Sequence, residues 1–175
     1  YERYGYHPLW TNSMYSGMPA FQILISSKYN IGLGWLHYIF TLNMPHSAGL
    51  FFLSCVCFYI LTQVLRLKPW VGILGSLAYG FASYNAIILA VGHITKFATM
   101  GYAPAVLAGI ILLMQRKYIL GFGVTVLFST LFFGQNHVQS VFYYMILILC
   151  LGIGFLIKTI QTKDYVHFFK TFALT

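Results

Sequence analysis

The stretch that decides the fold is residues 138–157, VQSVFYYMILILCLGIGFLI, in which no side chain carries a formal charge. About 20 apolar residues in a helix are enough to cross the roughly 30 Å hydrocarbon layer of a bilayer. Four upstream segments have the same character and are bounded by charged or turn-forming residues. They are residues 47–65, 70–91, 98–114 and 118–133. The sequence therefore predicts an all-α, polytopic transmembrane helical bundle with about five spans.

The composition excludes the main soluble classes. The chain has 175 residues, of which 59% are hydrophobic and only 7% are charged, and its mean hydropathy is +0.78. A soluble domain carries roughly 25% charged residues. The net charge of +8 does not indicate nucleic-acid binding, because most basic residues stand beside the ends of apolar segments. The expected partner is the lipid bilayer, and no nucleic acid is expected.

The distribution of basic residues predicts the orientation. The loops between the apolar segments are short, so consecutive spans are antiparallel neighbours and alternate loops lie on opposite sides. One side holds seven basic residues, Arg66, Lys68, Arg116, Lys117, Lys158, Lys163 and Lys170. The other side holds three, Arg3, Lys28 and Lys96. Because cytoplasmic loops carry the excess of Lys and Arg, residues 1–46, 93–96 and 135–137 are expected outside.

This pattern divides the chain into three parts. Residues 1–46 are expected to be an extracytoplasmic loop, in which residues 31–44 form a short interfacial helix rich in aromatic side chains. Residues 47–157 form the five-span bundle, in which glycines such as Gly121 and Gly123 are expected to permit close helix packing. Residues 158–175 are expected to be a cytoplasmic amphipathic segment leading toward a further span. The chain begins at Tyr1 without Met and ends in mid-pattern, so we expect it to be a segment of a longer protein.

The cysteines do not form a recognisable site. Cys55, Cys57 and Cys150 all lie in apolar segments, where a thiol behaves as a small hydrophobe. The Cys55-x-Cys57 spacing differs from the zinc and redox motifs. No disulfide framework, metal or cofactor is therefore expected.

Polar residues gather at the predicted outer ends of the spans. Lys96, His93 and His137 could supply positive charge and hydrogen-bond donors to a phosphate at the membrane surface. Amide and tyrosine side chains beside them could bind sugar hydroxyls. The pattern predicts a site for an anionic, lipid-linked sugar. Its candidate binding residues are Trp10, Asn12, His93, Lys96, Asn136, His137, Gln139 and Tyr143.

Each of these residues also has a purely structural interpretation. Lys96 could be a snorkelling anchor at a span end, and His93 and His137 could cap helix ends. Trp10 and Tyr143 could be aromatic residues of the membrane interface or of helix packing. No Ser/His/Asp triad can be assembled, and the only carboxylates are Glu2 and Asp164.

The polar clusters resemble those of the bacterial YfhO-like membrane proteins, a family of GT-C type glycosyltransferases. The matching stretches are PLWTNSM at 8–14 with GMPA at 17–20, GHITK at 92–96 with GYAP at 101–104, and NHVQ at 136–139 with YY at 143–144. The resemblance implies an enzyme of the bacterial cytoplasmic (inner) membrane that transfers a sugar from a polyprenyl-phosphate carrier. The acceptor would be a cell-envelope glycopolymer or glycoconjugate on the extracytoplasmic side. In that family the catalytic acid follows the first span, so it is expected upstream of Tyr1 and is not assigned to Glu2.

Two other functions remain open at this stage. One is a transporter or flippase for a lipid-linked or anionic solute, which would show charged residues or interrupted helices at mid-depth in the membrane. The other is a non-catalytic membrane scaffold, in which the outer polar residues would have no common site.

Overall fold

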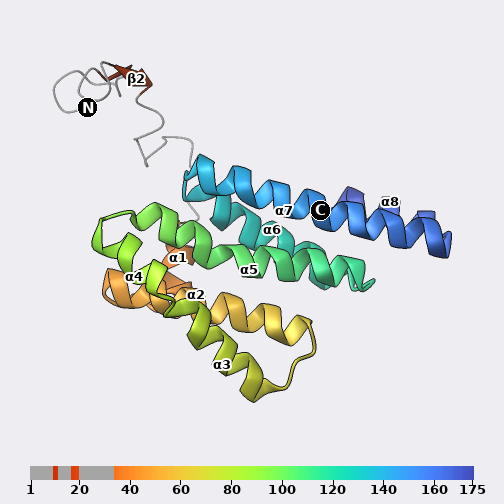
Figure 1. Cartoon of the computed structure of the whole chain (residues 1–175), viewed down its shortest axis with the longest axis horizontal. Coiled ribbons are helices and arrows are strands. Elements are labelled where there is room, and N and C mark those ends of the chain that lie inside the picture. The colour runs from red at the N-terminus through yellow and green to blue at the C-terminus, as the bar shows by residue number, and fades with distance from the viewer. Residues whose placement is uncertain (1–9, 12–16, 20–33) are drawn as a thin grey trace. The chain divides into compact units, whose positions relative to one another are not determined.

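The computed structural model describes residues 10–11, 17–19 and 34–175 of the chain (Figure 1). The chain divides into two compact units, Tyr1–Gly32 and Leu33–Thr175. In the first unit, strands β1 (Trp10–Thr11) and β2 (Met18–Pro19) pair antiparallel, with Trp10 opposite Pro19. Gly17 has φ +122°, and a Cβ there would lie 2.7 Å from the indole Nε1 of Trp10. The positive φ and the close approach of the Trp10 ring therefore require glycine at this position.

The second unit is an all-α helical bundle, which confirms the predicted fold class. It begins with a short helix and continues with six helices in the predicted spans and one after them. Their bounds are α1 (Gly34–Phe40), α2 (His46–Val64), α3 (Pro69–Gly80), α4 (Ser83–Ala90), α5 (Ile94–Met114), α6 (Tyr118–Gly134), α7 (Val138–Thr162) and α8 (Tyr165–Leu174).

Four helical segments of this unit are long and apolar enough to cross a membrane. They are His46–Val64, Pro69–Ala90, Ile94–Met114 and Val138–Thr162. Helix α6 is also apolar but has 17 residues, which is close to the lower limit for a span. All five predicted segments are therefore helical, and the protein is a multi-pass membrane protein.

The segment predicted at 70–91 consists of two helices. It breaks at Phe81 and Ala82, between α3 and α4. Asn85 is buried, and its Nδ2 donates to the carbonyl oxygens of Tyr79 at 2.8 Å and Gly80 at 3.0 Å. The carbonyls at a helix end lack intrahelical partners, so Asn85 satisfies two of them inside the bundle. The break was not predicted, because neither Phe81 nor Ala82 is a helix-breaking residue.

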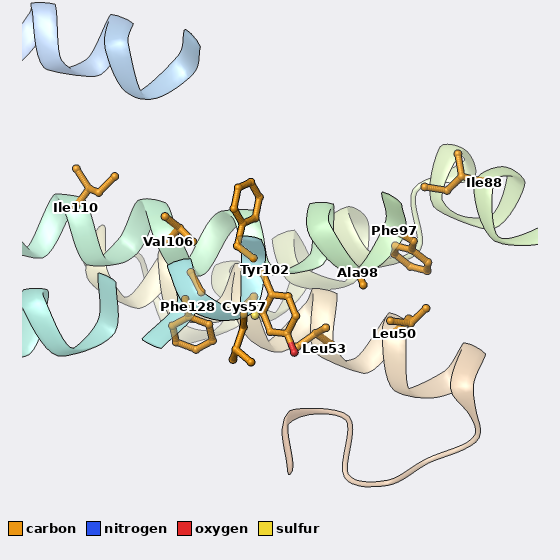
Figure 2. Close-up of a cluster of buried hydrophobic side chains, with 13 residues drawn as sticks. Leu50, Leu53, Cys57, Ile88, Phe97, Ala98, Tyr102, Val106, Ile110 and Phe128 are labelled. Carbon is orange, nitrogen blue, oxygen red and sulfur yellow. The ribbon is translucent and has the colours of Figure 1, made fainter. Parts of the chain in front are cut away.

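Helix α5 is the centre of the bundle, with α2 and α6 packed against it (Figure 1). Tyr102 of α5 is fully buried among Leu53 and Cys57 of α2 and Phe128 of α6 (Figure 2). Helices α5 and α6 approach closely at Gly121. A Cβ at this position would lie only 2.8 Å from the backbone nitrogen of Leu113. Small residues permit such backbone approach between membrane helices.

The short helix predicted within residues 31–44 is present as α1 and packs against the bundle. Nδ1 of His37 lies 2.8 Å from the Tyr102 hydroxyl, and the rings of Phe40 and Phe128 are 5.1 Å apart. Burial, and secondly the nearby charge of His46, lower the pKa of His37. His37 is therefore held neutral where α1 meets α5.

The last helices extend beyond the predicted bundle. Helix α7 continues to Thr162 rather than ending at residue 157, and α8 follows after a turn at Lys163 and Asp164. His167 of α8 directs Nε2 to the Met114 carbonyl at 3.0 Å and Nδ1 to the Tyr118 hydroxyl at 2.8 Å. A carbonyl only accepts, so Nε2 carries the proton and Nδ1 accepts from Tyr118. These bonds fasten α8 to the turn between α5 and α6.

Candidate functional site

A pocket of about 360 Å³ opens at the end of the bundle where α5 begins and α6 ends. This is the predicted outer end, and we call this cavity the outer pocket. It lies between α4, α5 and α7, and α6 contributes one side chain. Its lining residues are Tyr84, Lys96, Thr99, Met100, Ala103, Phe132, Gln139, Ser140, Tyr143, Tyr144 and Leu147.

Lys96 provides the positive charge of the outer pocket. It lies in the first turn of α5, whereas the predicted span began only at Ala98. Its Nζ is 5.3 Å from the centre of the Tyr84 ring on α4, which is within the range of a cation–π contact. The contact holds the ammonium group at the pocket wall, so Lys96 is positioned by the protein rather than only by the membrane surface.

His137 stands beside this charge at the start of α7. Its Nδ1 accepts the backbone N–H of Ser140 at 3.2 Å and so caps the helix. The pKa of His137 is lowered, mainly by burial and next by the charge of Lys96, with a smaller contribution from His93. A backbone hydrogen bond has the opposite, weaker effect. The neutral form therefore predominates at pH 7. It leaves Nε2–H as a donor, because Nδ1 serves as the cap acceptor.

A proline in α5 frees a backbone carbonyl beside the outer pocket. Pro104 has no N–H, so the carbonyl of Met100, four residues earlier, loses its helical partner. The Tyr79 hydroxyl of α3 donates to that carbonyl at 2.9 Å. The Tyr144 hydroxyl of α7 donates to the carbonyl of Ala103, the residue before the proline. Two tyrosines from different helices thus bind the backbone of α5 beside Pro104.

The structure brings some of the predicted binding residues together. Lys96, Gln139 and Tyr143 line the outer pocket, and His137 is close enough to Lys96 and to His93 for their charges to affect its own. Asn136 lies in the turn before α7 with φ 55° and does not line the pocket. Trp10 belongs to the other unit, and Asn12 lies outside the described residues.

Sequence reasoning did not assign Tyr84, Thr99 or Tyr144 to the site. Tyr84 follows the unpredicted helix break, and Thr99 was assigned to the first turn of a predicted span rather than to the polar cluster before it. Tyr144 was placed with Tyr143 in the outer polar cluster but not among the candidate binding residues. Pro104 was a usable signal for a different residue, Tyr79, because a proline inside an apolar helix frees a carbonyl that a hydroxyl can bind.

Two apolar cavities adjoin the outer pocket along α5 and α7. The nearer, of about 190 Å³, shares Phe132 and Tyr144 with it. The farther, of about 540 Å³, lies between α5, α7 and α8 and shares Ile110, Met145 and Ile148 with the nearer one. We call the two cavities together the apolar groove. The part of α5 from Lys96 to Met114 beside them is roughly 27 Å long at 1.5 Å per residue.

No metal-binding group of three or more His, Cys, Asp or Glu side chains occurs among the residues that the structure describes. Comparison of the chain with protein-family models, curated proteins and solved structures gave no match. The outer pocket and the apolar groove are therefore the features of this structure that bear on function.

Proposed function

We propose that the protein is a membrane glycosyltransferase of the GT-C type. It transfers a sugar from a polyprenyl-phosphate carrier to a cell-envelope acceptor on the extracytoplasmic side of the bacterial cytoplasmic membrane. The observation that supports this most is the cation of Lys96 at the wall of a pocket that adjoins a long apolar groove. The resemblance of the polar motifs to the YfhO-like proteins supports the same reaction class.

The two regions match the two parts of a lipid-linked sugar. A phosphate is an anion with several acceptor oxygens, and an ammonium group within a few ångströms stabilises it. Gln139 and the tyrosines beside it offer hydrogen bonds to sugar hydroxyls. An isoprenoid tail has no polar group and would occupy the apolar groove, where it gains contact with side chains of α5 and α7.

The proposed reaction is a direct displacement at the anomeric carbon. The acceptor oxygen forms the new bond to that carbon, and the bond from the carbon to the phosphate oxygen breaks. The lipid phosphate leaves with the bonding electrons, and Lys96 stabilises the negative charge that develops on it. His137 could donate Nε2–H to the same oxygen while remaining neutral.

A carboxylate must accept the proton of the acceptor hydroxyl. Within the described residues the one carboxylate is Asp164, which pairs with Arg116 at the opposite end of the bundle. Asp164 is therefore too far from Lys96 to be this base. The base belongs to a part of the protein outside the described residues.

The test is sugar transfer from a polyprenyl-phosphate sugar by the full-length protein at equal membrane levels. We expect Lys96→Gln to lower the rate roughly 100- to 1,000-fold, as loss of one oxyanion-type donor does. Lys96→Arg should also be impaired, because a planar guanidinium does not replace a compact ammonium group in a fitted site. Lys158→Gln is the matched control, because Lys158 is exposed near the other end of α7. Wild-type rates in both Lys96 variants would remove Lys96 from the site.

One observation favours a transporter or flippase as the second candidate. The break between α3 and α4 is the kind of interrupted helix that such proteins use. However, the charged residues of α2 to α7 are Lys96 and Lys158, and both lie near helix ends. Reconstituted vesicles distinguish the two functions: a flippase moves a labelled lipid-linked sugar between leaflets in the absence of any acceptor, and a transferase does not.

A further inference from the structure

Helix α7 has few contacts that hold it in place. In the most apolar stretch of α7 only 6% is buried inside the bundle, compared with 78% in the corresponding stretch of α5. The outer pocket and the apolar groove lie between these two helices. The position of α7 therefore sets the width of both.

Tyr144 makes a side-chain hydrogen bond that ties α7 to α5. Its hydroxyl donates to the Ala103 carbonyl, and its ring packs 5.0 Å from that of Phe132. Tyr144 and Phe132 line both the outer pocket and the nearer cavity of the apolar groove. The tie thus lies where the outer pocket meets the apolar groove.

We propose that Tyr144 is the positioning residue of the donor site, holding α7 at the spacing that joins the outer pocket to the apolar groove. The role in donor binding rests on the proposed function, because it places Tyr144 beside the junction between the phosphate and the tail of the lipid donor. The mechanical part, the α5–α7 spacing, depends only on the described contacts. Tyr144 does not take part in bond making or breaking.

The chain offers a matched control in Tyr79. Its hydroxyl donates to the Met100 carbonyl of the same helix, but from α3 rather than α7. Tyr79→Phe removes one tyrosine bond to α5 without releasing α7. Tyr144→Phe removes the corresponding bond on the other side and keeps the ring that packs on Phe132.

The first measurement is the distance between spin labels at Val126 of α6 and Ile146 of α7 in the full-length protein in lipid nanodiscs. Both positions are exposed and line none of the three cavities. We expect a single narrow distribution in the wild type and in Tyr79→Phe, and a broader or longer one in Tyr144→Phe. Tyr144→Met, which also lacks the hydroxyl, should behave in the same way and replaces Tyr144→Phe if that variant fails to fold. Unchanged distances in the Tyr144 variants would overturn the proposal.

The second measurement is transfer kinetics with a polyprenyl-phosphate sugar. Loss of one neutral hydrogen bond should raise KM for the lipid donor about three- to tenfold in Tyr144→Phe, with kcat changed less and Tyr79→Phe close to wild type. A fall of kcat by a similar factor, with KM unchanged, would contradict a positioning role in donor binding. If the wild type transfers no sugar, the proposed function fails, while the label distances still decide whether Tyr144 holds α7.

Discussion

At the scale of the residue, single polar side chains complete backbone groups that the membrane leaves without partners. Asn85 binds two carbonyls at the α3–α4 break, Tyr79 binds the carbonyl freed by Pro104, and His137 accepts a backbone N–H at the start of α7. Water cannot serve the groups bound by Asn85 and Tyr79 inside a bilayer. Polar residues at these positions are consequently structural as well as potential ligands.

The protonation of His137 gives a prediction at this scale. Its pKa is lowered in the folded protein by burial, and next by Lys96, so the unfolded chain binds the proton more readily. Stability is fully present above the ordinary histidine pKa and is lost as the pH falls through the lowered value. His137→Asn keeps a good helix cap but cannot titrate.

We therefore expect the thermal unfolding midpoint of the wild type in detergent to decrease as the pH is lowered from 7.5 to 5.5. His137→Asn should show a smaller fall, and the remainder would include His37, whose pKa is also lowered by burial. An identical pH dependence in wild type and variant would show that His137 does not gain its proton on unfolding in this range.

At the scale of the element, the apolar segments were predictable but their interruption was not. The length and hydropathy of the segments predicted α2, α5, α6 and α7 to within a few residues, because each must bury its backbone in a helix to cross the membrane. The α3–α4 break depends on the tertiary placement of Asn85, which no local sequence pattern at Phe81 and Ala82 reveals. The start of α5 at Ile94 also placed Lys96 inside the helix rather than in the preceding loop.

Two glycines of α6 provide a matched pair for testing the packing of α5 and α6. A Cβ on Gly121 would lie 2.8 Å from the Leu113 backbone nitrogen, whereas a Cβ on Gly123 would meet nothing within 4 Å. The prediction that both glycines serve close packing is thus confirmed for Gly121 and wrong for Gly123. The difference is one of helix face, which becomes known only once the partner helix is placed.

We expect Gly121→Ala to destabilise the protein by about 1–3 kcal/mol, the usual cost of overpacking. Gly123→Ala should be neutral or stabilising by about 0.5–1 kcal/mol, since alanine is the better helix former. The measurement is the unfolding midpoint of each purified variant in detergent. Equal destabilisation by both changes would contradict the described α5–α6 contact.

At the scale of the whole molecule, the basic residues predict the orientation of the bundle. Cysteines placed one at a time at positions 94 and 116 should report opposite sides of the membrane, with position 94 outside, because the excess of Lys and Arg is cytoplasmic. Labelling intact cells with an impermeant thiol reagent measures this. Modification at position 116 but not at position 94 would reverse the orientation and place the outer pocket in the cytoplasm.

Three of the eleven residues that line the outer pocket were predicted from the sequence. Lys96, Gln139 and Tyr143 could be predicted because loop lengths make the spans antiparallel neighbours, so that polar residues at alternate ends converge. Tyr84, Thr99 and Tyr144 could not, because their contribution depends on helix rotation and on the α3–α4 break. The contribution of Trp10 and Asn12 stays a prediction.

The most direct test of the proposed donor site is photolabelling with a polyprenyl phosphate that carries a diazirine in its tail. The full-length protein in native-like membranes is irradiated, and labelled peptides are identified by mass spectrometry. The account predicts adducts on α7 residues of the apolar groove, such as Met145 and Ile148, with a lower yield in Lys96→Gln. Equal labelling of other exposed positions such as Trp70 and Ile119, unaffected by Lys96→Gln, would contradict it.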